Sequence, residues 1–369
     1  MTATASSRLR QPPGPIANTL TSGQLPKLVE LYIIAGSLVV VGGVMAVMSS
    51  FNVGGWIFLS LVLYMIALGV LSTIAENRRK AVDRIIRSLV FVAFLLAIAP
   101  LISTLFTVTA QGIGQLNWSF ITTTGGAVFN PDTLTVTVAS GALQAIVGTL
   151  EITGIAALLS IPIGILTAIY LVEYALPNQW LARTVTFLVD VMTGIPSIVA
   201  GLFAFSLFSL IVGPKAFSGF SASVALSVLM IPIVVRSCEE MLRLVPQDLR
   251  EASFALGVSR FSTITKIVLP TAIAGIITGV MLAIARVIGE TAPIFMAASF
   301  TDNFNSNPFN GPMQTLPVLA YTGYKFPGQD IAASNASAWG AALLLVLLVV
   351  ILNVIARIVA KAFAPKGAR

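Results

Sequence analysis

Residues 245–270, VPQDLREASFALGVSRFSTITKIVLP, form a polar stretch between two long apolar runs. Pro246 suits the first turn of a helix, where its missing N–H leaves no hydrogen bond unmade. Asp248 and Glu251 follow in the first turns, where the helix dipole favours negative charge. Apolar residues at helical spacing predict one small apolar face, made of Leu249, Ala252, Ala255 and Leu256. The stretch is therefore expected to begin with a short amphipathic helix.

This helix is expected to stop at Gly257, which can take the left-handed backbone conformation that ends many helices. Ser259 can then cap a second short helix, which runs into Leu269 and Pro270. Two helices joined by a glycine predict an elbow that lies on the inner face of a membrane. Taken alone, the pattern is also that of an ordinary amphipathic connector between two spans.

The apolar runs beside this elbow belong to a chain of 369 residues that is 57% hydrophobic and 9% charged. Soluble domains carry about 25% charged residues, and the mean hydropathy of this chain is +0.96. The composition therefore indicates an integral membrane protein. The chain has no histidine and one cysteine, Cys238, so we expect neither a disulfide framework nor a metal centre.

Membrane spans can be located from the apolar runs, since a helix needs about 20 mostly apolar residues to cross about 30 Å of hydrocarbon. Eight runs are candidates, at about 28–48, 53–74, 88–110, 146–173, 185–211, 222–236, 270–299 and 337–360. We therefore predict an all-α polytopic membrane protein with about eight transmembrane helices. Two long outer loops, about 111–145 and 300–336, are interpreted either as a cap over the bundle or as a docking surface.

The positive charges predict the orientation of these helices. If the N-terminus is cytoplasmic, 18 of the 21 lysines and arginines fall in inner segments, Lys215 and Lys325 fall outside, and Arg286 lies in the membrane. The positive-inside rule is then satisfied with both termini in the cytoplasm. Topology thus explains the basic excess, and no basic patch with interleaved aromatic residues remains to indicate nucleic-acid binding.

The spacing within the elbow resembles the EAA motif of ABC importer permeases, in which E-A-A is followed by three residues, G, nine residues, I, one residue and L-P. The matching residues are Glu251, Ala252, Ser253, Gly257, Ile267, Leu269 and Pro270. Ser253 departs from the motif, but serine is small enough to keep a close approach to a partner. The resemblance implies a type I importer permease, with residues 237–269 as its cytoplasmic coupling loop.

In that family the coupling loop docks in a cleft of the ATP-hydrolysing subunit and transmits its motion. By resemblance, Glu251 contacts the ATPase, Ala252 allows close packing and Gly257 makes the turn. Leu269 and Pro270 complete the coupling motif. The chain contains no G-x-x-x-x-G-K-[ST] phosphate loop. We therefore expect a transport subunit that is not itself an enzyme and holds no cofactor, with ATP and Mg bound by a partner ATPase.

Further stretches resemble one branch of this family, the A-type permease subunits of Pst phosphate importers. They are AIYLVEYA (168–175), TGIPSIVAGLF (193–203), IPIVVRSCEEMLRLVPQDLREASFALG (231–257), VLPTAIAGIITGVMLAIARVIGETAP (268–293) and QTLPVLAYTGY (314–324). The resemblance covers a six-span permease domain, residues 88–362. Residues 28–87 are expected to add two spans and a cytoplasmic linker, 1–27 a disordered tail, and 363–369 a basic cytoplasmic tail.

The resemblance also implies an assembly in the lipid of a bacterial inner membrane. A homologous C-type permease would pair with this chain around a central pathway. Two ATP-binding cassette subunits would bind the coupling loops, and an extracytoplasmic phosphate-binding protein would deliver phosphate. Two other hypotheses stay open: a permease for another oxyanion, such as sulfate or molybdate, and an ion-coupled secondary transporter, although the latter would need no coupling motif.

Arg286 and Glu290 lie inside the apolar run of 270–299. A charge at the bilayer centre costs on the order of 3 kcal/mol and faces the bundle interior or a water-filled cavity. In a continuous helix the two residues would meet at i and i+4, so one interpretation is a structural ion pair. In the other, the planar fork of Arg286 binds a phosphate, and Glu290 keeps the affinity low enough for release.

Ser197 is a third candidate on the transport pathway. It follows Pro196, which should break or kink its helix. The Ser197 hydroxyl is interpreted either as a hydrogen-bond partner of phosphate or as the group that repairs this break.

Overall fold

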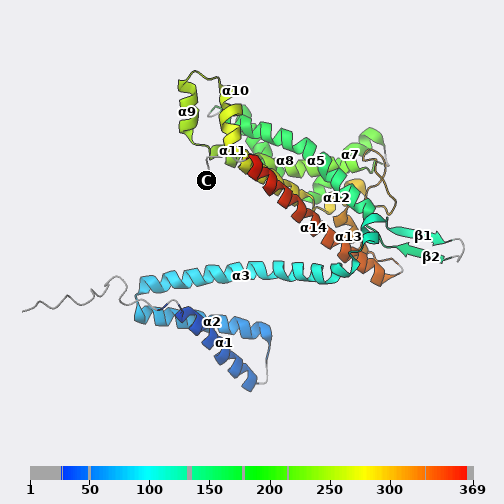
Figure 1. The fold of residues 1–369 in the computed structure, drawn as a ribbon. Helices are drawn as coiled ribbons and strands as arrows, with labels where there is room; N and C mark the ends of the chain where they lie inside the picture. The colour runs from blue at the N-terminus through cyan, green and yellow to red at the C-terminus, as the bar shows by residue number, and fades with distance from the viewer. Residues whose placement is uncertain are drawn as a thin grey trace, which may run out of the picture. The chain divides into compact units, whose positions relative to one another are not determined.

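The computed structural model describes residues 26, 28–48, 51–130, 135–176, 179–213, 216–328 and 330–363. Apart from Pro26 and Phe363, the expected tails of residues 1–27 and 363–369 lie outside these described residues. Residue contacts divide the chain into two compact units, Met1–Thr104 and Leu105–Arg369. The boundary falls inside one long helix, α3 (Arg78–Gly112), which therefore contributes to both units (Figure 1).

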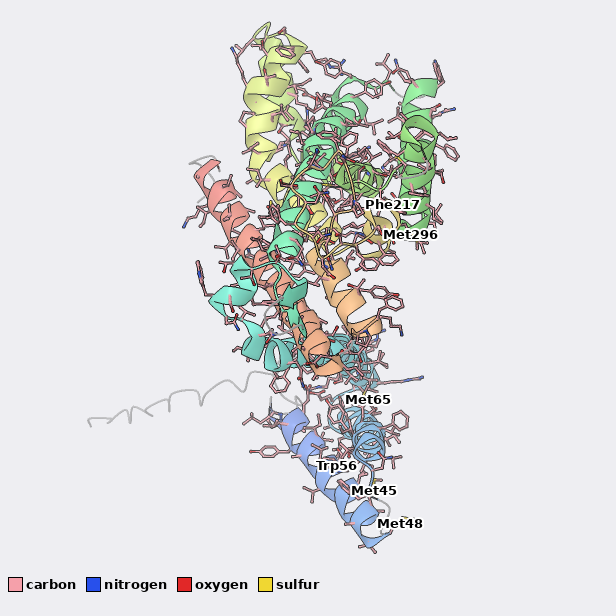
Figure 2. All side chains as sticks on the ribbon, turned by 90° about the vertical axis from the view of Figure 1, so that its right-hand side faces the viewer. Met45, Met48, Trp56, Met65, Phe217 and Met296 are labelled. Atoms are coloured by element: carbon pink, nitrogen blue, oxygen red, sulfur yellow. The ribbon has the colours of Figure 1, made fainter. Side chains whose placement is uncertain are left out.

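The N-terminal unit consists of α1 (Val29–Val47), α2 (Val53–Ala75) and the first part of α3. Asn52 caps α2, because its side chain accepts a hydrogen bond from the backbone N–H two residues later (2.9 Å). Trp56 of α2, labelled in Figure 2, donates from Nε1 to the carbonyl oxygen of Leu38 in α1 (2.9 Å). The two extra helices thus form a hairpin joined by a specific polar contact.

One arginine fastens this hairpin to α3. Arg84 of α3 donates from Nη2 to Glu76 Oε1 at the end of α2 (2.8 Å) and from Nη1 to Glu30 Oε1 of α1 (2.8 Å). The Glu76 side chain is 1% exposed, so Arg84 balances the charge of an almost fully buried carboxylate. Ser88 and Tyr64 add a hydrogen bond between α3 and α2 (3.0 Å).

The second unit contains the rest of α3 and the remaining elements. They are, in chain order, the 3-10 turn η1 (Ile113–Gln115), α4 (Trp118–Thr122), β1 (Gly126–Asn130), β2 (Thr135–Ala139), α5 (Leu143–Ile169), the π-turn η2 (Tyr170–Tyr174), α6 (Trp180–Thr193), α7 (Ser197–Val212), α8 (Gly219–Arg243), α9 (Gln247–Ala255), α10 (Arg260–Thr263), the π-turn η3 (Ile264–Val268), α11 (Leu269–Val287), α12 (Ala292–Ala298), α13 (Leu316–Lys325) and α14 (Ile331–Phe363).

Seven helices among the described residues are long and apolar enough to cross a membrane, and the bent pair of α6 and α7 makes up to eight. The predicted helical membrane protein with about eight spans is therefore confirmed. The antiparallel hairpin of β1 and β2, paired from Gly126 with Ala139 to Asn130 with Thr135, is an addition within the expected outer loop. The alternating sequence TVTVA at residues 135–139 is typical of a β-strand.

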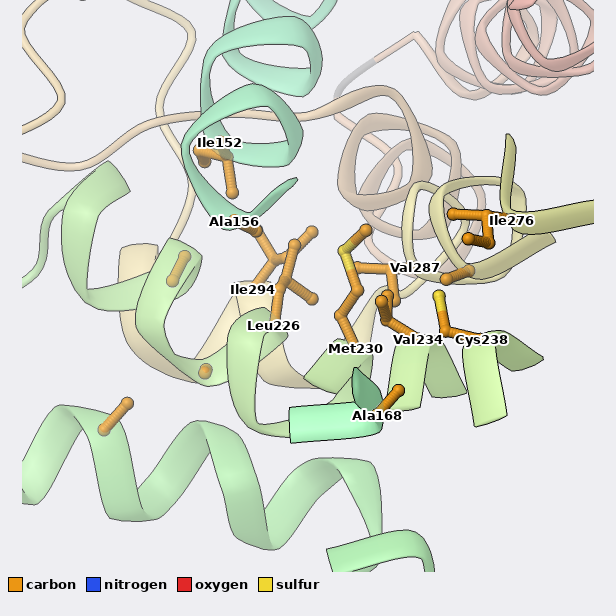
Figure 3. Packing of buried hydrophobic residues seen from close by; sticks show 14 of the residues in the cluster. Ile152, Ala156, Ala168, Leu226, Met230, Val234, Cys238, Ile276, Val287 and Ile294 are labelled. Atoms are coloured by element: carbon orange, nitrogen blue, oxygen red, sulfur yellow. The ribbon is translucent and has the colours of Figure 1, made fainter. Parts of the chain in front are cut away.

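The helix α8 lies at the centre of this unit. Of its apolar window 61% is buried, against 28% or less for each of the other long unbroken helices. Leu226, Met230, Val234 and Cys238 of α8 are fully buried and share one face, since residues four apart lie one helical turn from each other. The core cluster joins this face to α5, α11 and α12 (Figure 3), through residues that include Ile152, Ala156, Ile276, Val287 and Ile294.

Two expected spans have different bounds in the structure. The short run at 222–236 is part of a longer helix, α8, because polar residues that follow it continue the helix to Arg243. The expected helix over 270–299 is interrupted: α11 ends at Val287 and α12 begins at Ala292. Pro293 explains the interruption, since its missing N–H and its ring disfavour a continuous helix and suit the first turn of a new one.

Gly148 of α5 is expected to tolerate no side chain. An alanine Cβ there would lie 2.1 Å from the carbonyl oxygen of Gln314, so Gly148→Ala should cost about 1–3 kcal/mol of stability through overpacking. Gly154 lies in the same helix, and a Cβ there meets nothing within 4 Å. The thermal unfolding midpoint of the purified chain should therefore fall for Gly148→Ala and not for Gly154→Ala. Equal midpoints for the two variants would contradict the close packing.

Candidate functional site: a coupling elbow and a charged membrane turn

The elbow expected between two spans is present as α9, a turn at Gly257 and α10. Gly257 has φ +75°, a conformation that costs other residues about 1–2 kcal/mol. Ser259 caps α10 by accepting a hydrogen bond from the Ser262 N–H (3.4 Å). One detail differs from the expectation: Pro246 precedes the first turn of α9 as its N-cap residue and does not lie within it.

The elbow turns its apolar face away from the bundle. Glu251 and Ala252 are exposed. The large apolar side chains around them are exposed as well, Leu256 to 83%, and the others are Leu249, Phe254 and Phe261. Within α9, Ser253 is the buried residue. An exposed apolar patch with a carboxylate in it is typical of a surface that a protein partner covers.

Ser253, the residue that departs from the resembled motif, has a role inside the elbow. It is 3% exposed, and its hydroxyl shares a hydrogen bond with Thr263 of α10 (Oγ to Oγ1, 2.8 Å). Its carbonyl oxygen also accepts a hydrogen bond from the Val258 N–H (3.2 Å). The serine hydroxyl therefore joins the two helices of the elbow, which an alanine side chain could not do.

Leu269 and Pro270 lie where the elbow enters the membrane helix α11. Leu269 is half-buried against the core cluster, and Pro270 is exposed in the first turn of α11. Pro270 has no N–H to donate back along the helix, and the π-turn η3 lies directly before this end. The coupling motif therefore ends at an irregular turn that leads into the core.

A buried ion pair that the sequence alone does not reveal attaches α9 to the bundle. Arg250 donates to Glu173 Oε1 from Nη2 (2.8 Å) and from Nε (3.1 Å). The side chains of Arg250 and Glu173 are 13% and 7% exposed. Glu173 could be noticed as a carboxylate at the C-terminal end of an apolar run, but its partner lies 77 residues away in the sequence. The pair is made by tertiary structure.

Arg286 and Glu290 form no ion pair with each other among the described residues. Arg286 is exposed in the last turn of α11, and Glu290 is half-buried in the turn that follows. The i and i+4 geometry requires both residues to be in one helix, and the interruption after Val287 removes this condition. Neighbouring Val287 is 1% exposed in the core, so Arg286 lies beside the packed face of α11.

Ser197 is the first residue of α7, after a bend of 106° between α6 and α7. The break expected at Pro196 is therefore confirmed. In the part of the chain that the structure describes, the Ser197 hydroxyl makes no hydrogen bond that would repair the break. Gly201, one turn later in α7, approaches Pro293 so closely that a Cβ would lie 2.6 Å from the Pro293 Cα. The start of α7 therefore packs near the turn that carries Glu290.

Charges in the C-terminal parts of α6 and α8 form a second network. Arg236 donates to Asp190 of α6 and, from Nη1, to Glu239 Oε2 (2.9 Å). Arg243 donates to the other oxygen of Glu239 (2.6 Å). Within the described residues, no group of three or more His, Cys, Asp or Glu side chains is placed to hold a metal ion.

Comparison with known proteins gives the family of the chain. Residues 160–367 match the family model described as binding-protein-dependent transport system inner membrane component. The chain is 43% identical over 270 residues, 73% of its length, to 85% of the phosphate transport system permease protein PstA 1 of Mycobacterium tuberculosis (strain CDC 1551 / Oshkosh). It is 38% identical over 268 residues, 72% of its length, to 90% of the phosphate transport system permease protein PstA of Pasteurella multocida (strain Pm70).

Among solved structures, the chain is similar to a chain of the inward-facing MetNI methionine ABC transporter, with 23% identity and a TM-score of 0.49, over 60% of this chain and 96% of that one. The family match covers the elbow, the two bent helices and the interrupted span described above. The chain therefore belongs to the binding-protein-dependent transport system inner membrane components and, within them, to the permease proteins of the PstA type.

Proposed function

We propose that this chain is a transmembrane permease subunit of an ATP-driven phosphate importer. The observation that carries the proposal is the elbow, which exposes Glu251 and an apolar patch at the end of a membrane core. A secondary transporter has no need of such a surface. The choice of phosphate is supported by the relatives, which are named phosphate transport system permease proteins and match most of the chain.

The proposed assembly contains a C-type permease, two ATP-binding cassette subunits and an extracytoplasmic phosphate-binding protein. The partner ATPases bind ATP and Mg, because the sequence of this chain holds no phosphate-loop pattern. In this proposal the chain transports without hydrolysing ATP itself. The distribution of lysine and arginine supports cytoplasmic termini in a bacterial inner membrane.

The proposed pathway passes the turn between α11 and α12. Arg286 offers a guanidinium that has no partner among the described residues, and a guanidinium suits the paired oxygens of a phosphate. Glu290 supplies a nearby negative charge that limits the affinity for an anion. Ser197 contributes a hydroxyl from the first turn of α7, where helix N–H groups also favour an anion. The contact between Gly201 and Pro293 supports this placement.

The experiment that tests the proposal is uptake into proteoliposomes that hold the full assembly, with ATP inside and loaded binding protein outside. Labelled phosphate should accumulate with ATP and not without it. Uptake of sulfate or molybdate in place of phosphate would overturn the substrate and keep the ATP-driven permease. Phosphate uptake that follows an ion gradient and ignores ATP would instead favour a secondary transporter.

A further inference from the structure

The elbow helix α9 is too short and too exposed to be held by apolar packing. It has nine residues, and Ser253 is the buried one. Isolated helices of fewer than about 12 residues are marginal in water. The orientation of α9 must therefore come from polar contacts. Ser253 connects α9 to α10, which continues through η3 into the membrane helix α11. Arg250 connects α9 to two further membrane helices, α5 and α8.

Arg250 joins α9 to two membrane helices at once. Besides its two bonds to Glu173, it donates from Nη1 to the carbonyl oxygen of Val245 (2.6 Å) and from Nη2 to that of Leu242 (2.9 Å). Leu242 lies in the last turn of α8 and Val245 two residues after its end, where helix carbonyl oxygens lack partners within the helix and a cation is favoured. Glu173 lies in η2, the π-turn that ends α5.

The two helices joined in this way form a closely packed pair in the core. Ser223 of α8 donates to the carbonyl oxygen of Ile152 in α5 (3.1 Å). A Cβ at Gly164 of α5 would lie 2.5 Å from Val234 Cγ1 of α8. Because interiors packed this tightly transmit displacements, a helix fixed to α5 and α8 moves with the core.

Space beside the ion pair would let α9 tilt if the pair were lost. A cavity of about 690 Å³ is lined by Glu173, Arg250, Glu251, Phe254 and residues around them. Arg260 also lines the cavity, and its guanidinium lies over the Tyr174 ring, 5.3 Å from the ring centre. The cavity is lined by more polar than apolar side chains, and its apolar ones are Leu171, Val172 and Phe254, so packing alone would replace the bonds of Arg250 poorly.

We propose that Arg250 and Glu173 are positioning residues, which fix α9 to α5 and α8 so that movement at the elbow is transmitted to the transmembrane core. The proposal rests on the proposed function, because it assigns the pair to the coupling step of an ATP-driven importer. Arginine is required, since its planar fork reaches a carboxylate and two carbonyl oxygens together, whereas a lysine ammonium is a single point.

A first experiment measures the mobility of α9 without any substrate. A spin label is attached at Leu256→Cys, an 83% exposed position, in the full chain in phospholipid nanodiscs. The native Cys238 is fully buried and should remain unlabelled. Arg250→Lys should increase the mobility of the label. The matched control is Arg243→Lys, whose arginine is 66% exposed in its pair with Glu239. Equal spectra for the two variants would overturn the proposal.

A second experiment measures coupling in the assembled importer. Arg250→Lys should leave ATPase binding and the ATP concentration for half-maximal hydrolysis unchanged, while phosphate moved per ATP falls about tenfold, as for the loss of one charge-assisted hydrogen bond. Glu173→Gln keeps the bonds of Arg250 to the α8 carbonyl oxygens, so its loss should be smaller. The double variant should match Arg250→Lys alone.

These results separate coupling from assembly and from substrate. The positioning role would be overturned if Arg250→Lys and Glu173→Gln each transported as much phosphate per hydrolysed ATP as the parent. A loss of ATPase binding in Glu173→Gln would also overturn it, because the pair would then build the docking surface itself. If the parental importer uses ATP to transport an oxyanion other than phosphate, the proposed substrate is wrong. The mobility of the spin label still tests the role of Arg250 and Glu173.

Discussion

Replacement of Arg286 by glutamine is expected to lower ATP-driven phosphate uptake about 10- to 100-fold, because hydrogen bonds to charged groups contribute about 1.5–3 kcal/mol and each 1.4 kcal/mol is a factor of about ten. Glutamine keeps a polar end but loses the charge and the planar fork. Arg286 is exposed, with no ion pair among the described residues, so its interaction with an anion would require no other bond to break. Initial uptake rates in proteoliposomes provide the measurement.

Three comparisons make this result interpretable. Arg357→Gln removes an exposed charge from α14, away from the proposed pathway, and should leave uptake unchanged. Arg286→Lys keeps the charge without the fork and should transport at an intermediate rate. Basal ATP hydrolysis and recovery of the complex should stay at parental levels in all variants. If Arg286→Gln transports phosphate at the parental rate, Arg286 has no role on the pathway.

Replacement of Glu251 by alanine is expected to weaken binding of the ATPase subunit by a factor of about 30 or more, since truncating one partner of a buried charge pair costs about 2–5 kcal/mol. Glu251 is exposed within an apolar patch in the isolated chain. A partner that covers the patch would take this carboxylate out of water, so the charge must then be met by a cation. Titration of labelled ATPase onto the chain in nanodiscs measures the affinity.

Asp248 offers a matched control in the same helix. It is exposed in the first turn of α9, and Asp248→Ala removes a carboxylate whose helix-dipole contribution is about 0.3–1 kcal/mol. The ATPase affinity should therefore change less than about sixfold. Similar losses for both variants would mean that general negative charge, and not the position of Glu251, directs docking.

The elbow could be predicted from the sequence because its determinants are local. Gly257 takes a positive φ that favours glycine. Ser259 caps α10 by accepting a hydrogen bond from the N–H three residues later. The attachment of the elbow could not be predicted in this way. Arg250 and Glu173 are 77 residues apart, and nothing near either residue in the sequence specifies its partner.

The interruption between α11 and α12 could not be predicted from the sequence either. Hydropathy treats 270–299 as one run, because the residues between α11 and α12 are few and Glu290 is the charged one among them. Pro293 was visible, yet prolines also occur inside unbroken helices of this chain, such as Pro162 in α5 and Pro232 in α8. Pro293 therefore breaks this run together with the close packing of α12 against α7, where Gly201 meets Pro293. The interruption also explains why Arg286 and Glu290 form no ion pair among the described residues.

The outward-facing apolar patch of the elbow also bears on how such a chain survives synthesis. Leu256 and Phe261 present large apolar side chains to water, at a cost of about 25 cal/mol for each Å² that stays uncovered. A subunit without its partners would expose this apolar surface as soon as the elbow folds, and such an exposed surface favours aggregation. If the proposed ATPase covers the patch, assembled copies would hide it, whereas unassembled copies would still expose it and so differ from assembled ones at their surface.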